Sequence, residues 1–249
     1  MSVEARLSAA GFIAAREEAR ELLAAAGGDL WLLEKMLQRR LSGEPLAWIC
    51  GRTTFCGIEL FIDTGVYVPR SHTEVIAQRA AALLGETGIA IDLCTGSGAI
   101  ARVLRETRPR ATVIATDLDA RAVACAHRNG VDARLGDLFR PLPSDIRDRV
   151  DLIVAVVPYV PTSKLALLQR DTFRFENTLA YDGGTGGADT LRRVIAESPA
   201  WLRPGGVLML EMGTDQQGSV ARDLRAAGFH DLQSIIDQDG DPRGICAIR

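Results

Sequence analysis

Residues 89–98 read Ile-Ala-Ile-Asp-Leu-Cys-Thr-Gly-Ser-Gly, and this stretch decides the fold. An apolar run that ends near Asp92 and passes through Gly96 and Gly98 is typical of a buried strand that turns directly into a helix. We expect that helix over 98–107. Glycines let the backbone of such a turn approach a ligand closely, because they carry no Cβ. The stretch therefore predicts a cofactor site at the carboxyl end of a strand.

The chain beyond this turn alternates between apolar runs and helical segments. We expect strands at 112–116, 131–135, 150–156, 207–211, 232–236 and 245–248, and helices at 119–128, at 189–198 and in a segment that ends near Ala227. Strands joined by helices need right-handed crossovers, which give a mostly parallel sheet covered on both faces. The pattern therefore predicts a doubly wound α/β domain. Its first helix is expected from Ser71 to about Leu84, because Ser71 and Glu74 have capping-box spacing.

Residues 3–41 follow a helical pattern. Gly27 and Gly28 interrupt it, and Asp29 is placed to cap the next helix. That helix is expected to carry one apolar stripe, made of Leu30, Leu33, Leu37 and Leu41. Residues 53–70 include a β-branched and aromatic segment with a turn at Gly57, which predicts a hairpin connector. We predict a helical domain over 1–52, a connector over 53–70 and a catalytic domain over 71–249.

Composition and charge limit the classes of function. The formal net charge is −3 and the pI is about 5.7, which argues against a broad basic surface for nucleic acid. The five cysteines form no Cys-x-x-Cys pair and the three histidines are far apart, so no metal site is expected. No run of 18 apolar residues occurs. We expect a cytoplasmic protein with no membrane association and no direct nucleic-acid partner.

Charge distinguishes two cofactors that such a glycine turn can bind. A nicotinamide dinucleotide would place an anionic pyrophosphate near Asp92, whereas S-adenosylmethionine would place a cationic sulfonium and an ammonium there. Asp117 and Asp137 follow the next two predicted strands, so three strand ends carry an acid. The three acids suit the ammonium, the ribose hydroxyls and the adenine amino group in turn. We therefore predict S-adenosylmethionine as the cofactor, bound by Asp92, Cys94, Thr95, Gly96, Gly98, Asp117, Leu118, Asp137 and Leu138.

Motifs along almost the whole chain resemble one enzyme family. They are Gly43-Glu44-Pro45-Leu46, Phe55-Cys56-Gly57, Val68-Pro69-Arg70 with Thr73-Glu74, the glycine turn with Asp117 and Asp137-Leu138, Pro158-Tyr159-Val160-Pro161, and Asp182-Gly183-Gly184. Together they are similar to the HemK-like protein-(glutamine-N5) methyltransferases, which modify peptide chain release factors. The resemblance implies a Rossmann-like class I methyltransferase sheet with an antiparallel last strand. It also implies a helical N-terminal domain that helps to recognise a protein substrate.

One motif departs from the family pattern. The family has Asn-Pro-Pro-Tyr after its fourth strand, where this chain has Val156, Val157, Pro158 and Tyr159. The resemblance implies that these four positions form the catalytic acceptor site, in which the Asn oxygen and a backbone carbonyl hold the NH2 group of the acceptor amide. Valine cannot accept that hydrogen bond. Its presence is expected to slow glutamine methylation about 10- to 150-fold.

Four polar side chains are candidates to replace the missing acceptor: His72, Tyr159, Gln169 and Glu176. A histidine can also serve as a general base near neutral pH, although one in the first turn of a helix more often faces solvent. The leading hypothesis is methyl transfer to a carboxamide or another heteroatom of a protein or peptide, such as a release factor. Two alternatives stay open: methylation of a small molecule or natural product, and cofactor binding without catalysis.

Overall fold

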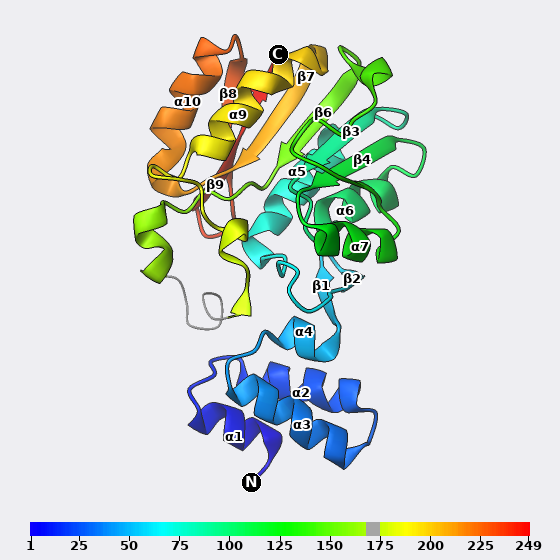
Figure 1. The fold of residues 1–249 in the computed structure, drawn as a ribbon, viewed down its shortest axis with the longest axis vertical. Coiled ribbons are helices and arrows are strands. Elements are labelled where there is room, and N and C mark those ends of the chain that lie inside the picture. Colours follow the sequence, from blue (N-terminus) through cyan, green and yellow to red (C-terminus); the bar gives the residue numbers. More distant parts are fainter. Residues whose placement is uncertain (168–174) are drawn as a thin grey trace.

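The computed structural model describes residues 1–167 and 175–249. Figure 1 shows three parts along the long axis of the molecule: a helical bundle at the N-terminal end, a small hairpin, and a sheet with helices on both faces. The C-terminus lies at the far end, in the sheet domain. Within the described ranges, no helix has both the length and the apolar character needed to cross a bilayer.

Three helices form the N-terminal bundle: α1 (Val3–Ala9), α2 (Ala15–Ala26) and α3 (Leu30–Leu41). Their apolar side chains form a core of their own. Asp29 caps α3 as predicted, because its Oδ1 accepts hydrogen bonds from the backbone N–H groups of Trp31 and Leu32 at 2.9 and 3.0 Å.

The apolar stripe of α3 is only partly as predicted. Leu33 and Leu37 are buried in the bundle core, but Leu30 is 78% exposed and Met36 is buried in its place. The buried face follows positions 33, 36, 37 and 40, which are three or four residues apart. Leu30 lies at the edge of that face, at the first residue of the helix, and so it projects into solvent.

A hairpin connects the bundle to the sheet. β1 (Arg52–Phe55) and β2 (Ile58–Phe61) pair antiparallel. Cys56 and Gly57 form the turn between them and both have positive φ, as the two central residues of a type I′ turn do. The hairpin expected around Gly57 is therefore confirmed.

The short helix α4 (Leu46–Cys50) joins the two apolar cores of the molecule. Trp48 packs in the core of the sheet domain, and its Nε1 donates a hydrogen bond to the carbonyl of Val66 at 2.8 Å. The next residue, Ile49, packs in the core of the helical bundle. One helical turn thus contributes to both cores.

A seven-stranded sheet forms the large domain, in the order β5-β4-β3-β6-β7-β9-β8. Pairing is parallel from β5 to β7, and β9 pairs antiparallel with both β7 and β8. The predicted doubly wound sheet with an antiparallel last strand is confirmed. The strands are β3 (Ile89–Leu93), β4 (Thr112–Asp117), β5 (Asp132–Leu135), β6 (Val150–Ala155), β7 (Leu202–Glu211), β8 (His230–Ile236) and β9 (Pro242–Ile248).

Helices cover both faces of this sheet (Figure 1). Leu152 and Val154 of β6 point into one apolar core, while Ile153 and Ala155 point into the other, because successive side chains of a strand alternate between its faces. The first core contains side chains of α5 (Glu74–Leu83), α6 (Ala99–Thr107) and α7 (Ala120–Arg128), and the second those of α9 (Asp189–Glu197) and α10 (Gln217–Ala226).

Two local details differ from the predictions. The helix expected from Ser71 to about Leu84 is present, as a 3-10 turn over Ser71–Thr73 followed by α5, but the predicted capping box is wrong because no side chain caps either element. The Thr73 hydroxyl instead donates to Glu211 at 2.6 Å, a contact between segments far apart in sequence. The strand expected from residue 207 begins at Leu202, because the backbone of 205–206 stays in the sheet through hydrogen bonds with Arg249.

Candidate active site

The carboxyl ends of the parallel strands meet at one edge of the sheet. Asp92 is the next-to-last residue of β3, Asp117 ends β4 and Glu211 ends β7. Asp137 follows β5, and the segment 156–159 follows β6. The sheet therefore brings to a single edge the three acids predicted for the cofactor and the segment predicted for the acceptor.

Asp92 lies inside the protein at this edge, with 2% of its surface exposed. Its Oδ2 accepts hydrogen bonds from the Thr95 hydroxyl at 2.6 Å and from the backbone N–H of Ala101 at 3.1 Å. Burial raises the pKa of Asp92 to about 7, although these two hydrogen bonds oppose the shift. A cationic ligand group nearby would favour the ionised carboxylate.

Asp117 holds the glycine turn from the neighbouring strand. Its Oδ2 accepts a hydrogen bond from the backbone N–H of Gly96 at 2.8 Å, and its Oδ1 accepts one from the N–H of Asp119 at 2.9 Å. Burial raises the pKa of Asp117 as well. The acid expected to bind the ribose therefore also fixes the loop against which a cofactor would lie.

The two glycines of the turn have different roles. Gly96 has a φ of +57°, and an added Cβ would meet no described heavy atom closer than the Tyr67 Cβ at 4.0 Å. Gly98 has a φ of +81°, and its added Cβ would lie 3.0 Å from side-chain carbons of both Ala126 and Val131. Gly96 thus has no tight neighbour, whereas Gly98 lets α6 pack closely on its neighbours.

Cys94 and Thr95 complete the turn between β3 and α6. Cys94 has a positive φ of 57°, and burial raises the pKa of its thiol, which keeps the thiol neutral. The backbone N–H of Thr95 donates to the carbonyl of Thr116 at 3.0 Å, which ties the turn to β4. Both residues shape the loop, and their contact with a cofactor stays a prediction.

The third acid already has a cationic partner. Oδ2 of Asp137 lies 2.7 Å from an Nη of Arg193 on α9. The next residue, Leu138, is buried and has a φ of +48°. Leu118, directly after Asp117, is 69% exposed and offers an apolar surface beside the acid predicted to bind the ribose. To make the predicted contact with adenine, Asp137 would have to accept a hydrogen bond from the adenine amino group while it stays paired with Arg193.

The edge has the features of a site for a ligand that carries donors and positive charge. Four carboxyl groups lie there, those of Asp92, Asp117, Asp137 and Glu211, and an added Cβ on Gly96 would have no described neighbour closer than 4.0 Å. The Thr116 hydroxyl oxygen is buried without a hydrogen-bond partner within the described part of the chain. Buried polar atoms are normally satisfied, so this oxygen indicates an additional partner. These residues fit S-adenosylmethionine.

The segment predicted to bind the acceptor is folded against the sheet. Val157 is buried, and half-buried Val156 packs on the opposite core. Pro158 is partly exposed. The carbonyl of Tyr159 accepts a hydrogen bond from Nε2 of Gln216 at 3.0 Å, which fixes the end of the segment. Its catalytic role stays a prediction.

The sequence prediction did not include Glu211, a buried carboxylate with 1% of its surface exposed. Its Oε2 accepts a hydrogen bond from the Thr73 hydroxyl at 2.6 Å, and its Oε1 accepts one from the Tyr159 hydroxyl at 3.2 Å. Nε2 of His72 lies 3.5 Å from the same Oε1. The sequence did contain a signal for Glu211, because it is an acid at the end of a predicted strand, and the same signal identified Asp92.

The four candidates for a replacement acceptor have different surroundings. His72 and Tyr159 both contact Glu211. Glu176 belongs to another cluster, in which its Oε2 lies 2.5 Å from an Nη of Arg70 and accepts a hydrogen bond from the Tyr181 hydroxyl. Gln169 lies outside the described residues.

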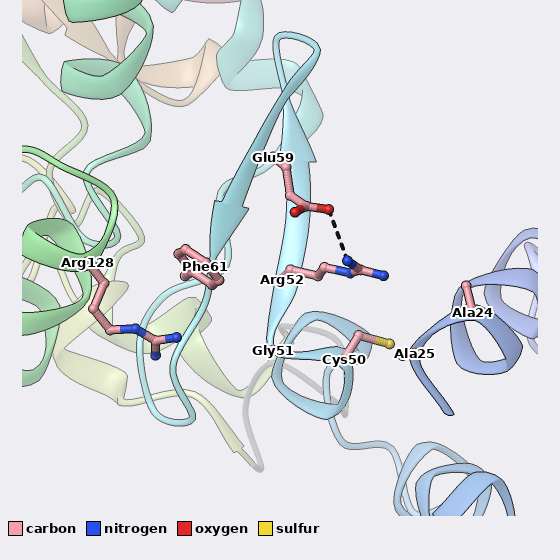
Figure 2. A pocket seen from close by; sticks show the side chains of 8 residues that line it. All are labelled: Ala24, Ala25, Cys50, Gly51, Arg52, Glu59, Phe61 and Arg128. Carbon is pink, nitrogen blue, oxygen red and sulfur yellow. Dashed lines mark ion pairs between the residues drawn. The ribbon is translucent and has the colours of Figure 1, made fainter. Parts of the chain in front are cut away.

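A cavity of about 500 Å³ lies away from this edge, between the helical bundle, the hairpin and α7. Figure 2 shows its lining, in which Arg52 and Glu59 of the hairpin form an ion pair at 3.2 Å. Arg128, on the other side, pairs with Asp63. The charged groups of this cavity are thus already paired, and no strand end of the sheet reaches it.

Comparisons with known proteins place the chain among methyltransferases. The model of the methyltransferase small domain matches residues 71–160. A release factor glutamine methyltransferase from Geobacter sulfurreducens is 36% identical over 216 residues, which cover 84% of this chain and 75% of that protein. Another, from Cereibacter sphaeroides, is 34% identical over 267 residues, covering 97% of this chain and 94% of that protein.

Solved structures show the same fold. A methyltransferase from Pyrococcus furiosus has a TM-score of 0.54 at 18% identity, covering 86% of this chain and 98% of that one. At this identity the likeness concerns the fold alone. Both relatives above are more than 30% identical to this chain, and the match with the Cereibacter sphaeroides protein covers nearly all of it. The chain therefore belongs to the family of release factor glutamine methyltransferases.

Proposed function

We propose that this protein transfers a methyl group from S-adenosylmethionine to the side-chain nitrogen of a glutamine in a peptide chain release factor, in the cytoplasm. The observation that carries the proposal is the match with a release factor glutamine methyltransferase over 97% of the chain. The match extends through the N-terminal bundle as well as the sheet domain, so it includes the part expected to recognise a protein substrate.

The sheet edge supplies residues for the cofactor. Asp92 would face the cationic end, Asp117 the ribose hydroxyls and Asp137 the adenine amino group, with Leu118 against the adenine ring. No described atom lies closer than 4.0 Å to the Cβ position of Gly96, which would let a ligand approach the backbone there. When bound, S-adenosylmethionine supplies an electrophilic methyl group on a sulfonium. The fixed loop and its carboxylates would hold that group in one orientation before the acceptor arrives.

The acceptor segment would position the amide. Its nitrogen is a weak nucleophile, because its lone pair is delocalised into the carbonyl. Backbone and side-chain acceptors that hold both N–H groups direct the nitrogen at the methyl group, and a dry apolar pocket favours the in-line arrangement. The carbonyl of Val157 is one acceptor available to the segment. Val156 provides none from its side chain.

A labelling experiment tests the proposal. The purified protein is incubated with tritiated S-adenosylmethionine and a bacterial cell extract, and separately with a purified release factor. We expect label in the release factor band, on a glutamine. Label confined to a small organic molecule would support the alternative acceptor that Val156 raises. Binding of the cofactor with no labelled product would indicate a module without catalysis.

A further inference from the structure

Glu211 and Val156 occupy equivalent positions on neighbouring strands. Ala155 of β6 pairs with Leu210 of β7, so Val156 and Glu211 are the next residues of the two strands. Both side chains lie on the same face of the sheet: Val156 packs on the core that contains α5, and Glu211 contacts Thr73 at the start of that helix. A buried carboxylate therefore stands beside the position at which the family motif would place its amide.

Glu211 is surrounded by donors. The hydroxyls of Thr73 and Tyr159 each contact one of its two oxygens, and the ring of His72 lies 3.5 Å away. Each of the two hydroxyls donates its single hydrogen to an oxygen of Glu211.

This contact determines which hydrogen bonds Tyr159 can still make. A phenol has one hydrogen to donate and lone pairs with which to accept. Burial and the charge of Glu211 both raise the pKa of Tyr159, so the phenol keeps its hydrogen at neutral pH and gives it to the carboxylate. Only lone pairs remain on the side of the oxygen that faces away from Glu211.

The position of Tyr159 is fixed at both ends of the residue. Its hydroxyl is held by Glu211, and its carbonyl accepts a hydrogen bond from the buried Gln216, whose Nε2 also donates to the carbonyl of Gly187 at 2.9 Å. An oxygen held in this way loses little entropy when it binds a ligand, which makes it an effective element of a binding site.

We propose that Glu211 orients the Tyr159 hydroxyl so that the phenol oxygen accepts a hydrogen bond from the NH2 group of the acceptor glutamine, in the role that the side chain of Val156 cannot fill. Tyr159 would contact the substrate, and Glu211 would be a positioning residue. This inference rests on the proposed function, since it names the acceptor as a carboxamide. It explains how a chain with valine in the motif retains an oriented acceptor.

A double-mutant cycle with Val156→Asn and Tyr159→Phe tests the inference. The substrates are a purified bacterial release factor and a synthetic peptide from it that contains the glutamine. With Val156 present, Tyr159→Phe is expected to lower kcat about ten- to a hundredfold while the affinity for S-adenosylmethionine is unchanged. With Asn at position 156, which supplies its own acceptor oxygen, the same change is expected to cost less than about threefold. Equal losses in both backgrounds would overturn the inference.

Glu211→Gln provides a second, independent variant. The glutamine amide can donate to the phenol, which frees the phenol hydrogen to point toward the substrate. We expect a kcat loss similar to that of Tyr159→Phe, little further loss in the Tyr159→Phe/Glu211→Gln double variant, and recovery with Val156→Asn. Full activity of Glu211→Gln would contradict the positioning role. Thermal unfolding and cofactor affinity are measured for each variant as controls. A variant with a lowered unfolding temperature or weakened cofactor binding has lost more than the contact under test.

Binding measurements separate this inference from the proposed function. Calorimetry with the glutamine peptide and S-adenosylhomocysteine is expected to show weaker peptide binding by Tyr159→Phe than by the unaltered protein. If the unaltered protein binds S-adenosylmethionine but neither binds nor methylates the peptide and the release factor, the proposed function itself fails. If it methylates both and the cycle is additive, the function stands and only the role of Tyr159 and Glu211 is refuted.

Discussion

The hydroxyl of Thr95 donates a hydrogen bond of 2.6 Å to the carboxyl group of Asp92, inside the protein. This bond and the one from Ala101 only partly offset the burial of Asp92, whose pKa is raised to about 7. A carboxyl group whose pKa is higher in the folded than in the unfolded state stabilises the fold at low pH. That contribution is lost as the pH rises from about 4 through 7.

Asp92→Asn is therefore expected to change how stability depends on pH. The variant keeps an oxygen that can accept both hydrogen bonds but does not ionise. Relative to the variant, the unaltered protein should lose about 2 to 3 kcal/mol of unfolding free energy between pH 5 and pH 8. Urea unfolding of both proteins at several pH values measures this. If the unfolding free energies of the two proteins change with pH in the same way, Asp92 does not titrate in this range.

The same ionisation should govern cofactor affinity. As the pH rises from 6 to 8, Asp92 gains charge, and the unaltered protein should bind S-adenosylmethionine more tightly relative to Asp92→Asn. Calorimetric titrations of both proteins at each pH remove the contribution of the ligand's own ionisation. A constant ratio of the two affinities across this range would place the cationic end of the ligand away from Asp92.

Alanine substitutions at the two glycines of the turn should affect different properties, stability at Gly98 and cofactor affinity at Gly96. Gly98→Ala introduces a Cβ 3.0 Å from Ala126 and Val131 at a φ of +81°, so it is expected to lower the unfolding free energy by about 2 to 4 kcal/mol. Gly96→Ala has backbone strain of about 1 kcal/mol and no close contact, but its methyl group would lie where the cofactor is proposed to approach the turn. We expect it to reduce cofactor affinity more than stability. Thermal unfolding and calorimetry on this matched pair distinguish packing from ligand contact.

The ion pair between Asp137 and Arg193 gives a further matched comparison. Arg193 is about half exposed, and an exposed pair contributes little. Arg193→Ala is therefore expected to change cofactor affinity less than about threefold. Asp137→Ala removes the proposed acceptor for the adenine amino group and should weaken binding about tenfold. Equal effects of the two changes would show that the pair, rather than the carboxylate, matters for the ligand.

Val156→Asn tests the departure from the family motif directly. The introduced amide would stand beside Glu211, which can take its N–H groups and leave its oxygen for the substrate. We expect kcat on release factor glutamine to rise severalfold, because Tyr159 already supplies part of that function. Val156→Leu serves as a control for side-chain volume and should give no rise. A native chain that is already fully active, with no gain from Asn, would contradict our account of the acceptor site.

The order of helices and strands could be predicted because each element leaves a local pattern. The glycine turn after Asp92 and the cap at Asp29 are of this kind, since the residues that interact are close in sequence. Glu211 and Tyr159 are 52 residues apart, and only the parallel register of β6 and β7 shows that they meet. The pairing of Asp137 with Arg193 likewise depends on how α9 packs on the sheet. Such contacts leave no periodic signal in the sequence.

The sharing of α4 between two cores fixes where the helical bundle lies relative to the sheet. Trp48 and Ile49 are anchored in different domains. The bundle is therefore not joined to the sheet domain by a flexible linker, and its distance from the sheet edge is fixed. Under the proposed function, a release factor that docks on the bundle brings its glutamine to the sheet edge only if the distance between docking surface and glutamine matches this spacing. Inserting one residue in α4 would rotate the bundle by about 100° relative to the sheet domain. A folded substrate that docks on the bundle would then no longer place its glutamine at the sheet edge. Methylation of a short peptide, which does not need to dock on the bundle, would be unaffected by the insertion.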